Sequence, residues 1–358
     1  MKYWNAHQIS RLSKMREGFI GGTAGEADYW ASLEDLELYE KTFAQRIAWK
    51  WDAVLGELEL RKWSPSGSKV VDVGCGSGVA GRKFLEQWRE MVSEVVLLDR
   101  SPLARSYATK ALLPHQVDVR DGGSALSTEI VTDATVLVSH VVTELSPAQL
   151  NEWVECVSGA SCLIWVEAAT HDASRRLVEF VREPLLKAGW SAVAPCTHSS
   201  RCPMLTAENE RHWCHHFARV PSFVHQDPAW KELSSAVGVD LRVLPYSFLV
   251  MEKTRSNAVS RPAEDAVGGA GHAARPVGSR PVGSRGLCRV IGAPREFKGY
   301  LKVLRCDKAG VEEVVLQKRD VPMAFKDLSR GEGVPVYRFR EESGKVLDAK
   351  RFSEAEDA

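Results

Sequence analysis

Residues 70–81 read Val-Val-Asp-Val-Gly-Cys-Gly-Ser-Gly-Val-Ala-Gly, and this stretch decides the fold. A short apolar run leads into Gly74, Gly76 and Gly78, and residues 81–88 follow with a helical pattern. Glycine suits a backbone that turns tightly and lets a ligand come close, and a helix that starts after such a turn presents free N–H groups. The stretch therefore predicts a buried strand, a loop for a nucleotide-type cofactor and a helix.

The regions around this loop repeat the change from strand to helix. Strand-like runs are expected at 94–98, 115–119, 134–138 and 162–167, and helices at 101–112 and 147–157. Alternation of this kind predicts an α/β fold with a parallel, doubly wound sheet and right-handed crossovers. Before the loop, Ser32 is expected to cap one helix that runs to about Leu60, and the first 30 residues look irregular.

Three aspartates stand where a cofactor would meet the ends of the strands. Asp72 precedes the first glycine, and Asp99 ends the second strand, 21 residues after Gly78. A carboxylate at that place can accept hydrogen bonds from both ribose hydroxyls of an adenosine. Asp118 is expected to end the third strand, beside the adenine.

The glycine loop itself narrows the choice of cofactor. Its acid before the first glycine and its Gly-x-Gly-x-Gly spacing resemble motif I of class I S-adenosylmethionine (SAM)-dependent methyltransferases more than a loop for NAD. An NAD site and a glycine-rich turn that binds nothing are the alternatives. The expected cofactor contacts are Asp72, Gly74, Gly76, Gly78, Asp99, Asp118 and Ser139.

The catalytic group is harder to assign. Ser139-His140-Val141-Val142-Thr143-Glu144 follows the fourth strand, where methyltransferases that act on exocyclic amines carry Asn-Pro-Pro-Tyr or Asp-Pro-Pro-Tyr. His140 or Glu144 could serve as a general base, or both could line the cofactor. The catalytic residues therefore stay open.

Three of the eight cysteines, Cys196, Cys202 and Cys214, fall within 19 residues that lack periodicity. A reducing compartment argues against disulfides. Gaps of five and eleven residues fit structural zinc poorly, whereas soft thiolates on an irregular loop suit an iron–sulfur cluster. Cys306, which ends a strand-like run, is the expected fourth ligand, and Cys288 is its rival. Zinc or no metal are the alternatives, and one histidine among His198, His212, His215 and His216 could replace a cysteine.

The cysteine segment is similar to the Rsm22 family, which includes the mitochondrial methyltransferase-like protein 17. The similarity rests on Pro195-Cys196-Thr197-His198, Cys202-Pro203, Trp213-Cys214-His215-His216-Phe217, Arg289-Val290-Ile291 and Pro294-Arg295. It extends from about residue 35 to about residue 320, with a long gap between Cys202 and Cys214 and an extra His216.

This resemblance implies a SAM-binding, methyltransferase-type domain, a structural iron–sulfur cluster of the 4Fe-4S type, and action on the small ribosomal subunit and its rRNA during assembly. Methyl transfer is left open. An active rRNA methyltransferase of the same fold is the first competing hypothesis. The second is a metal- or redox-responsive binding protein whose glycine loop is vestigial.

Basic residues gather in 266–308, where nine Lys or Arg stand against two acids, a net charge of +7. Such a segment meets an anionic partner or is simply solvated. Under the resemblance, contacts to rRNA are expected from Arg289, Arg295, Lys298, Lys302 and Arg305.

No run approaches the roughly 20 apolar residues of a membrane span, and the N-terminus lacks a secretory or transit pattern. A cytoplasmic, bacterial-type protein is expected, monomeric off the ribosome and without a membrane partner.

The expected organisation has six segments. They are a helical region (1–66), a SAM-binding domain (67–190), a Cys/His loop with the end of the sheet (191–253), a disordered insertion (254–286), a basic β-rich module (287–345) and a polar tail (346–358). The insertion contains Arg-Pro-Val-Gly-Ser twice, and its composition cannot bury enough apolar surface to fold.

Overall fold

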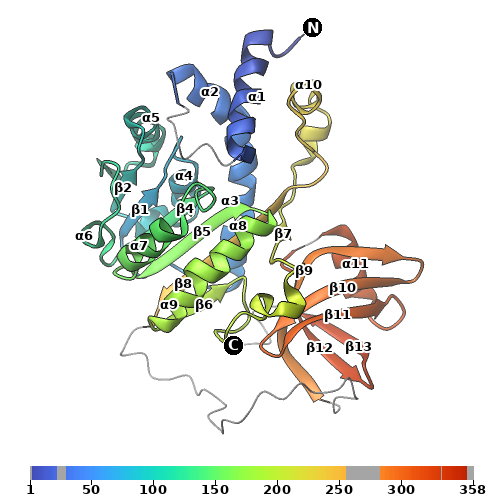
Figure 1. The fold of residues 1–358 in the computed structure, drawn as a ribbon. Coiled ribbons are helices and arrows are strands. Elements are labelled where there is room, and N and C mark those ends of the chain that lie inside the picture. Colours follow the sequence, from blue (N-terminus) through green and yellow to red (C-terminus); the bar gives the residue numbers. More distant parts are fainter. Residues whose placement is uncertain (1, 22–29, 255–282, 332, 353–358) are drawn as a thin grey trace.

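The computed structural model describes residues 2–21, 30–254, 283–331 and 333–352, which form two sheets (Figure 1). The larger sheet has eight strands and the smaller has five. None of the described helices is long and apolar enough to cross a membrane. Residues 255–282 of the predicted disordered insertion lie outside the described part of the chain.

The larger sheet is parallel through most of its width, in the order β3-β2-β1-β4-β5-β8-β6, with β7 paired to β8. Its strands are β1 (Lys69–Val73), β2 (Glu94–Leu98), β3 (Asp118–Asp121), β4 (Thr135–Ser139), β5 (Cys162–Ala168), β6 (Trp190–Ala194), β7 (His216–Phe217) and β8 (Pro245–Lys253). Strand β8 runs antiparallel to β5, β6 and β7. This arrangement confirms the predicted doubly wound α/β sheet of the class I methyltransferase type.

Helices cover both faces of this sheet, because successive side chains of a strand point to opposite faces. Val70 belongs to the core cluster of Trp51 and Phe84, whereas its neighbour Val71 belongs to the opposite cluster with Leu150 and Trp165. The helices between the strands are α4 (Val79–Trp88), α5 (Pro102–Leu112), α6 (Thr128–Val131), α7 (Pro147–Val157), α8 (His171–Arg176) and α9 (Glu183–Lys187), with a π-helical segment at Leu177–Arg182. Short 3-10 turns occupy Arg89–Met91, Leu113–His115, Pro203–Leu205, Ala207–Asn209 and Ser222–His225.

The helical region before the sheet contains α2 (Leu33–Lys41) and α3 (Phe43–Leu60). Ser32 is the N-cap of α2, as predicted, and its N–H donates to Asp35 Oδ2 at 3.0 Å. The predicted single helix to Leu60 is wrong, because Thr42 has non-helical angles, φ −131° and ψ −90°. The Leu38 carbonyl accepts from the hydroxyl of Thr42, at 2.7 Å. This side-chain bond takes the place of a helical backbone bond at the junction of the two helices.

The first residues of the chain are not irregular, contrary to the prediction. Helix α1 (Ala6–Gly21) packs with α10 (Pro228–Val237) in a core cluster that contains Trp230. Only Leu12 and Met15 of α1 are buried. Such a narrow apolar stripe is hard to recognise before the partner helix is known.

The smaller sheet forms the C-terminal module, in the order β11-β10-β9-β12-β13. Its elements are β9 (Gly283–Phe297), β10 (Tyr300–Asp307), β11 (Gly310–Gln317), α11 (Pro322–Arg330), β12 (Val336–Glu342) and β13 (Lys345–Arg351). Strands and helix enclose a separate core around Cys288, Phe325 and Phe339. The predicted β-rich module is confirmed, but the predicted polar tail begins too early, because Val346 is buried within β13.

Candidate functional site

The glycine loop connects β1 to α4 at the carboxyl edge of the sheet. Gly74, Gly76 and Gly78 have φ values of +67°, +52° and +80°, which L-residues with side chains rarely adopt. A Cβ atom on Gly74 would lie 2.8 Å from Val141 Cγ2, and one on Gly78 would lie 2.9 Å from Leu112 Cδ1. A Cβ atom on Gly76 would meet nothing within 4 Å. The loop is therefore tightly packed at both ends and open at its centre, where a ligand can approach the backbone.

Asp99 and Asp72 are both tied to this loop. One Asp99 carboxylate oxygen accepts from the Gly76 N–H at 3.0 Å, and the other accepts from the Ser101 N–H at 2.9 Å. Asp72 is fully buried and accepts from the Gly81 N–H at 3.0 Å. Burial raises the pKa of Asp72 to about 7. Asp72 thus fixes the start of α4, and Asp99 stands beside the open centre of the loop.

The prediction that Asp118 ends the third strand is wrong. Asp118 begins β3 and pairs with Glu94, the first residue of β2, so it lies at the amino edge of the sheet. Gln116 adopts φ +54° and delays the strand by three residues. Asp121 ends β3 instead, and its carboxylate accepts from Arg105 Nε at 2.6 Å and from the Gly123 N–H at 2.8 Å.

A side chain that the sequence did not indicate, Lys50, contacts the loop after β4. Lys50 of α3 places its Nζ 2.9 Å from His140 Nε2, and His140 Nδ1 lies 3.1 Å from Ser139 Oγ. Trp51 Nε1 also donates to Ser139 Oγ, at 3.1 Å. Burial, and then Lys50, lowers the pKa of His140 well below its ordinary value, and burial lowers the pKa of Lys50 to about 7. Both ring nitrogens of His140 are thus occupied by the protein itself.

Two buried glutamates complete this region. Glu167, at the end of β5, accepts from the N–H groups of Val141 and Val142, both at 2.8 Å, and from Trp165 Nε1 at 2.6 Å. It holds the loop in place and was not predicted. Burial raises the pKa of Glu144 to about 7. Of the two candidate bases, Glu144 is the one whose protonation changes near neutral pH.

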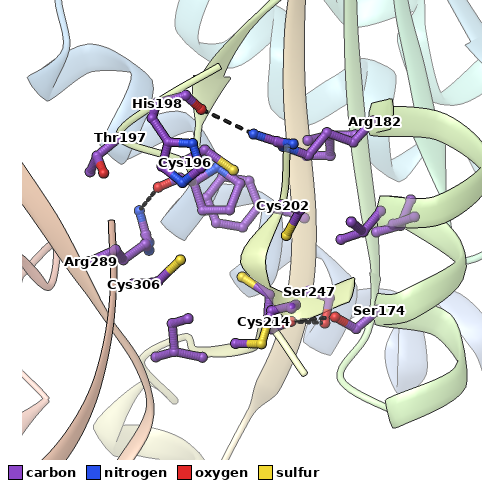
Figure 2. A pocket seen from close by; sticks show the side chains of 17 residues that line it. Ser174, Arg182, Cys196, Thr197, His198, Cys202, Cys214, Ser247, Arg289 and Cys306 are labelled. Atoms are coloured by element: carbon purple, nitrogen blue, oxygen red, sulfur yellow. Dashed lines mark hydrogen bonds between the residues drawn. The ribbon is translucent and has the colours of Figure 1, made fainter. Parts of the chain in front are cut away.

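A second site lies between the larger sheet and the C-terminal module. Cys196, Cys202, Cys214 and Cys306 line one cavity of about 30 Å³, and Figure 2 shows their sulfur atoms around a common space. Apart from these thiols its lining is largely apolar, from residues such as Val178, Met204 and Ile291. All eight cysteines are free thiols. Four thiols from two distant parts of the chain therefore line one cavity.

Burial governs the protonation of these thiols. It raises the pKa of Cys202 to about 12 and raises the pKa of Cys214 and Cys306 further, with neighbouring cysteines adding to each effect. Arg182 also lines the cavity with 1% of its surface exposed, and it donates to the carbonyls of His198 (3.1 Å) and Ser200 (2.9 Å). Without a metal, Cys202, Cys214 and Cys306 are expected to keep their protons.

Other polar groups frame the cavity. Arg182 pairs with Glu183, whose carboxylate accepts from the Cys202 N–H at 3.0 Å. His216 Nε2 lies 3.5 Å from Cys214 Sγ. His198 Nδ1 is buried and has no hydrogen-bond partner within the described part of the chain. The sequence pointed to the cysteines and histidines but not to Arg182 or Glu183, which belong to a helical segment with no unusual pattern.

The alternative fourth thiol lies elsewhere. Cys288 is fully buried in the core of the C-terminal module, and its Sγ donates to the Tyr337 carbonyl at 3.2 Å. Cys306, by contrast, lines the cavity. Among the described residues, no group of three or more Cys, His, Asp or Glu side chains has an arrangement that could hold a metal ion.

Two of the predicted rRNA contacts are wrong. Arg289 is 3% exposed and pairs with Glu57, and Arg305 is 1% exposed and pairs with Glu312 and Glu341. Neither guanidinium faces solvent, so neither can reach a phosphate. The remaining three predicted contacts, Arg295, Lys298 and Lys302, lie around the β9–β10 turn, where Arg295 and Lys302 pair with Glu313.

The sheet order, the glycine loop and the acid after β2 define a SAM-dependent methyltransferase-type domain, here joined to a β-rich module through a four-cysteine cavity. The model of the family Rsm22, described as mitochondrial small ribosomal subunit Rsm22, matches residues 43–333. The chain belongs to this family.

Solved methyltransferases are similar to the chain at low identity. A SAM-dependent methyltransferase from Leishmania major is 12% identical (TM-score 0.38), over 67% of this chain and 86% of that one. Magnesium protoporphyrin IX methyltransferase from Synechocystis PCC 6803, with bound SAM, is 12% identical (TM-score 0.37; 68% and 97%). Precorrin-6y C5,15-methyltransferase from Geobacter metallireducens is 14% identical (TM-score 0.34; 56% and 87%). No curated protein matches the chain significantly. Similarities this low do not bear on substrate or activity.

Proposed function

We propose that this protein binds SAM at the glycine loop, holds a 4Fe-4S cluster on Cys196, Cys202, Cys214 and Cys306, and acts on the small ribosomal subunit during assembly. The observation that carries the proposal is the meeting of these four thiols at one cavity between the two sheets. The family match supports a ribosomal partner. The compartment and the monomeric state off the ribosome stay predictions, the cytoplasm being the expected compartment.

The chemistry of the donor set fits an iron–sulfur cluster. The four thiols are soft ligands, no carboxylate lines the cavity, and the cationic groups of Arg182 and Arg289 line it and can balance a negatively charged cluster. All four thiols line one common cavity, as the ligands of a single cluster would. When bound, the cluster would join the 196–214 segment to β10 as a structural cross-link.

The geometry of the glycine loop supports SAM binding. Its centre is open beside Gly76, and the Asp99 carboxylate stands next to it for the ribose hydroxyls. The residues after β4, where a methyl acceptor would be expected, do not give the same support for methyl transfer. Lys50 and Ser139 already engage both nitrogens of His140 there. We therefore propose that SAM stabilises the fold and that methyl transfer is not the main activity. The second candidate, an rRNA methyltransferase, would use Glu144, whose pKa is raised to about 7 by burial.

An exposed surface at the β9–β10 turn suits RNA. Phe297, 41% exposed, and Tyr300 stack with ring centroids 4.8 Å apart and an interplanar angle of 8°. Arg295 and Lys302 form the cross-strand pair two residues further along β9 and β10, and Lys298 lies in the turn itself. Aromatic faces stack on unpaired bases, and the cations contact phosphates. We propose that this turn is the rRNA-facing part of the C-terminal module.

Co-sedimentation with free small subunits tests the proposed function. Anaerobically purified protein should sediment with small subunits and not with large ones, and chelation of its iron should weaken the association, since the cluster orders the module that carries the turn. Protein that binds SAM but sediments with neither subunit would contradict the ribosomal part. Association that depends on iron while SAM binding is absent would favour the metal- or redox-responsive binding protein.

A further inference from the structure

We infer that Arg289 and Glu57 form the positioning pair that sets three of the four cysteines around the cavity, an inference that rests on the proposed function of that site. Arg289 lies on β9 and Glu57 on α3, 232 positions apart in the chain. Their bond is bidentate, with Nη1 2.6 Å from Oε1 and Nη2 2.8 Å from Oε2. The side chains are 3% and 2% exposed.

Arg289 reaches each of the three cysteine-bearing segments. Its Nη1 also donates to the Pro195 carbonyl at 3.1 Å, directly before Cys196. Its Nε donates to His216 Nδ1 at 3.3 Å, and the other nitrogen of that ring lies 3.5 Å from Cys214 Sγ. Figure 2 shows Arg289 beside Cys306, and the pairing of β9 with β10 places the two residues directly opposite each other.

The fourth cysteine, Cys202, is positioned by a different residue, so it serves as an internal control. The Cys202 N–H is bound by Glu183, and Arg289 has no hydrogen bond to that segment among the contacts described. Glu57 Oε1, which accepts from Arg289 Nη1, also accepts from Arg61 Nε at 3.0 Å and from Arg61 Nη2 at 2.8 Å. Arg61 contacts none of the cysteine segments in these hydrogen bonds, so it can be removed as a matched control.

The chemistry of the guanidinium explains why an arginine stands here. Its planar fork donates in several fixed directions at once, so one side chain can bind a carboxylate, a carbonyl and an imidazole. The guanidinium carbon lies over the Phe248 ring, 5.4 Å from the ring centroid. Removing Glu57 alone would leave a buried, unpaired cation, whereas replacing both partners with apolar groups can preserve the packing. The double variant therefore avoids an unpaired charge at this position, and the protection of the core thiols reports whether its fold is intact.

The test is thiol protection in the metal-free, full-length protein. N-ethylmaleimide labelling, mapped by mass spectrometry, would compare the wild type with the double variant Glu57→Leu/Arg289→Met and with Arg61→Met. In the double variant, Cys196, Cys214 and Cys306 should react at least about tenfold faster, because local opening exposes them. Cys202 should change least, and the core thiols Cys75 and Cys162 should stay protected, which reports an intact fold. Arg61→Met should match the wild type.

The outcomes separate this inference from the proposed function. Wild-type rates at all three cysteines in the folded double variant would overturn the inference, even if the wild type carries iron. Faster labelling of the three cysteines, in a protein whose wild type never holds iron, would support the positioning pair and contradict the cluster. Loss of iron in the double variant, together with its retention in Arg61→Met, would support both.

Discussion

Lys50 Nζ lies 2.9 Å from His140 Nε2, although 90 positions separate the two residues in the chain. The contact places a cation from α3 in the loop after β4, where a methyltransferase of this fold would receive its acceptor. Since Ser139 Oγ engages the other ring nitrogen, His140 has no free nitrogen with which to remove a proton. The protein's own side chains thus engage both nitrogens of the histidine that follows β4.

These contacts of His140 predict the result of a methyl-transfer assay. With labelled SAM and immature small subunits, the wild-type protein should transfer no methyl group above background, because both nitrogens of His140 are already engaged. His140→Gln serves as the companion variant. Transfer that survives in His140→Gln and disappears in Glu144→Gln would establish the competing hypothesis of an active rRNA methyltransferase.

The cofactor loop predicts unequal roles for two aspartates. Asp99→Ala should weaken SAM binding by about 1–3 kcal/mol in calorimetry, because the ribose hydroxyls lose a charged acceptor. Gly76→Val should be worse, since its φ of +52° strains any side chain and the open centre of the loop is then blocked. Asp118→Ala, at the opposite edge of the sheet, is the matched control and should bind normally. Equal losses at Asp99 and Asp118 would contradict this placement of the cofactor.

Asp72 predicts a pH dependence of stability. Burial raises its pKa from 3.8 to about 7, so the folded state binds the proton more tightly than the unfolded state. The contribution of this group is fully present below about pH 4 and is lost as the pH rises through about 7. Asp72→Asn keeps the acceptor for the Gly81 N–H and cannot ionise. Its free energy of unfolding should exceed that of the wild type by roughly 1–3 kcal/mol at pH 8 and match it near pH 4.

Urea unfolding at pH 4, 6 and 8 checks this expectation, with the exposed Asp118→Asn as control. A constant difference between Asp72→Asn and the wild type at all three values would show that Asp72 ionises normally in the folded protein.

The rRNA-facing turn predicts a change in salt dependence. Replacing Arg295, Lys298 and Lys302 with Gln should lower the slope of log affinity against log salt by about 2–3, since each phosphate contact contributes about 0.7–0.9. A control triple of exposed basic residues on other elements, Lys326, Arg330 and Arg340, should leave the slope unchanged. If both triples flatten the slope equally, the attraction comes from net charge and not from the turn.

The sheet could be predicted from the sequence because its strands are short, buried on both faces and separated by glycines and helices. The end of the third strand could not, because its exposed aspartates give no apolar run and Gln116 shifts its start. Helix α1 was missed for a related reason, since only Leu12 and Met15 are buried and they pack against residues distant in the chain, such as Trp230 of α10.

The residues of the candidate site also divide into those that could be predicted from the sequence and those that could not. The sequence indicated Cys196, Cys202 and Cys214 because they lie close together in the chain. It indicated Cys306 because this residue ends a strand-like run. Arg289 was misassigned to RNA because a charged residue in a β-strand normally faces water. Its buried partner Glu57 lies on a helix 232 positions away, and no local pattern reveals such a pair.

Iron and acid-labile sulfide analysis of protein purified without oxygen tests the central claim most directly. The wild type should contain about four iron and four sulfide per chain. Cys306→Ser should lose both, and Cys288→Ser should keep both, because Cys288 lies in a separate core. Zinc without sulfide in the wild type, or iron that survives Cys306→Ser and is lost in Cys288→Ser, would contradict a cluster held by the four cysteines of this cavity.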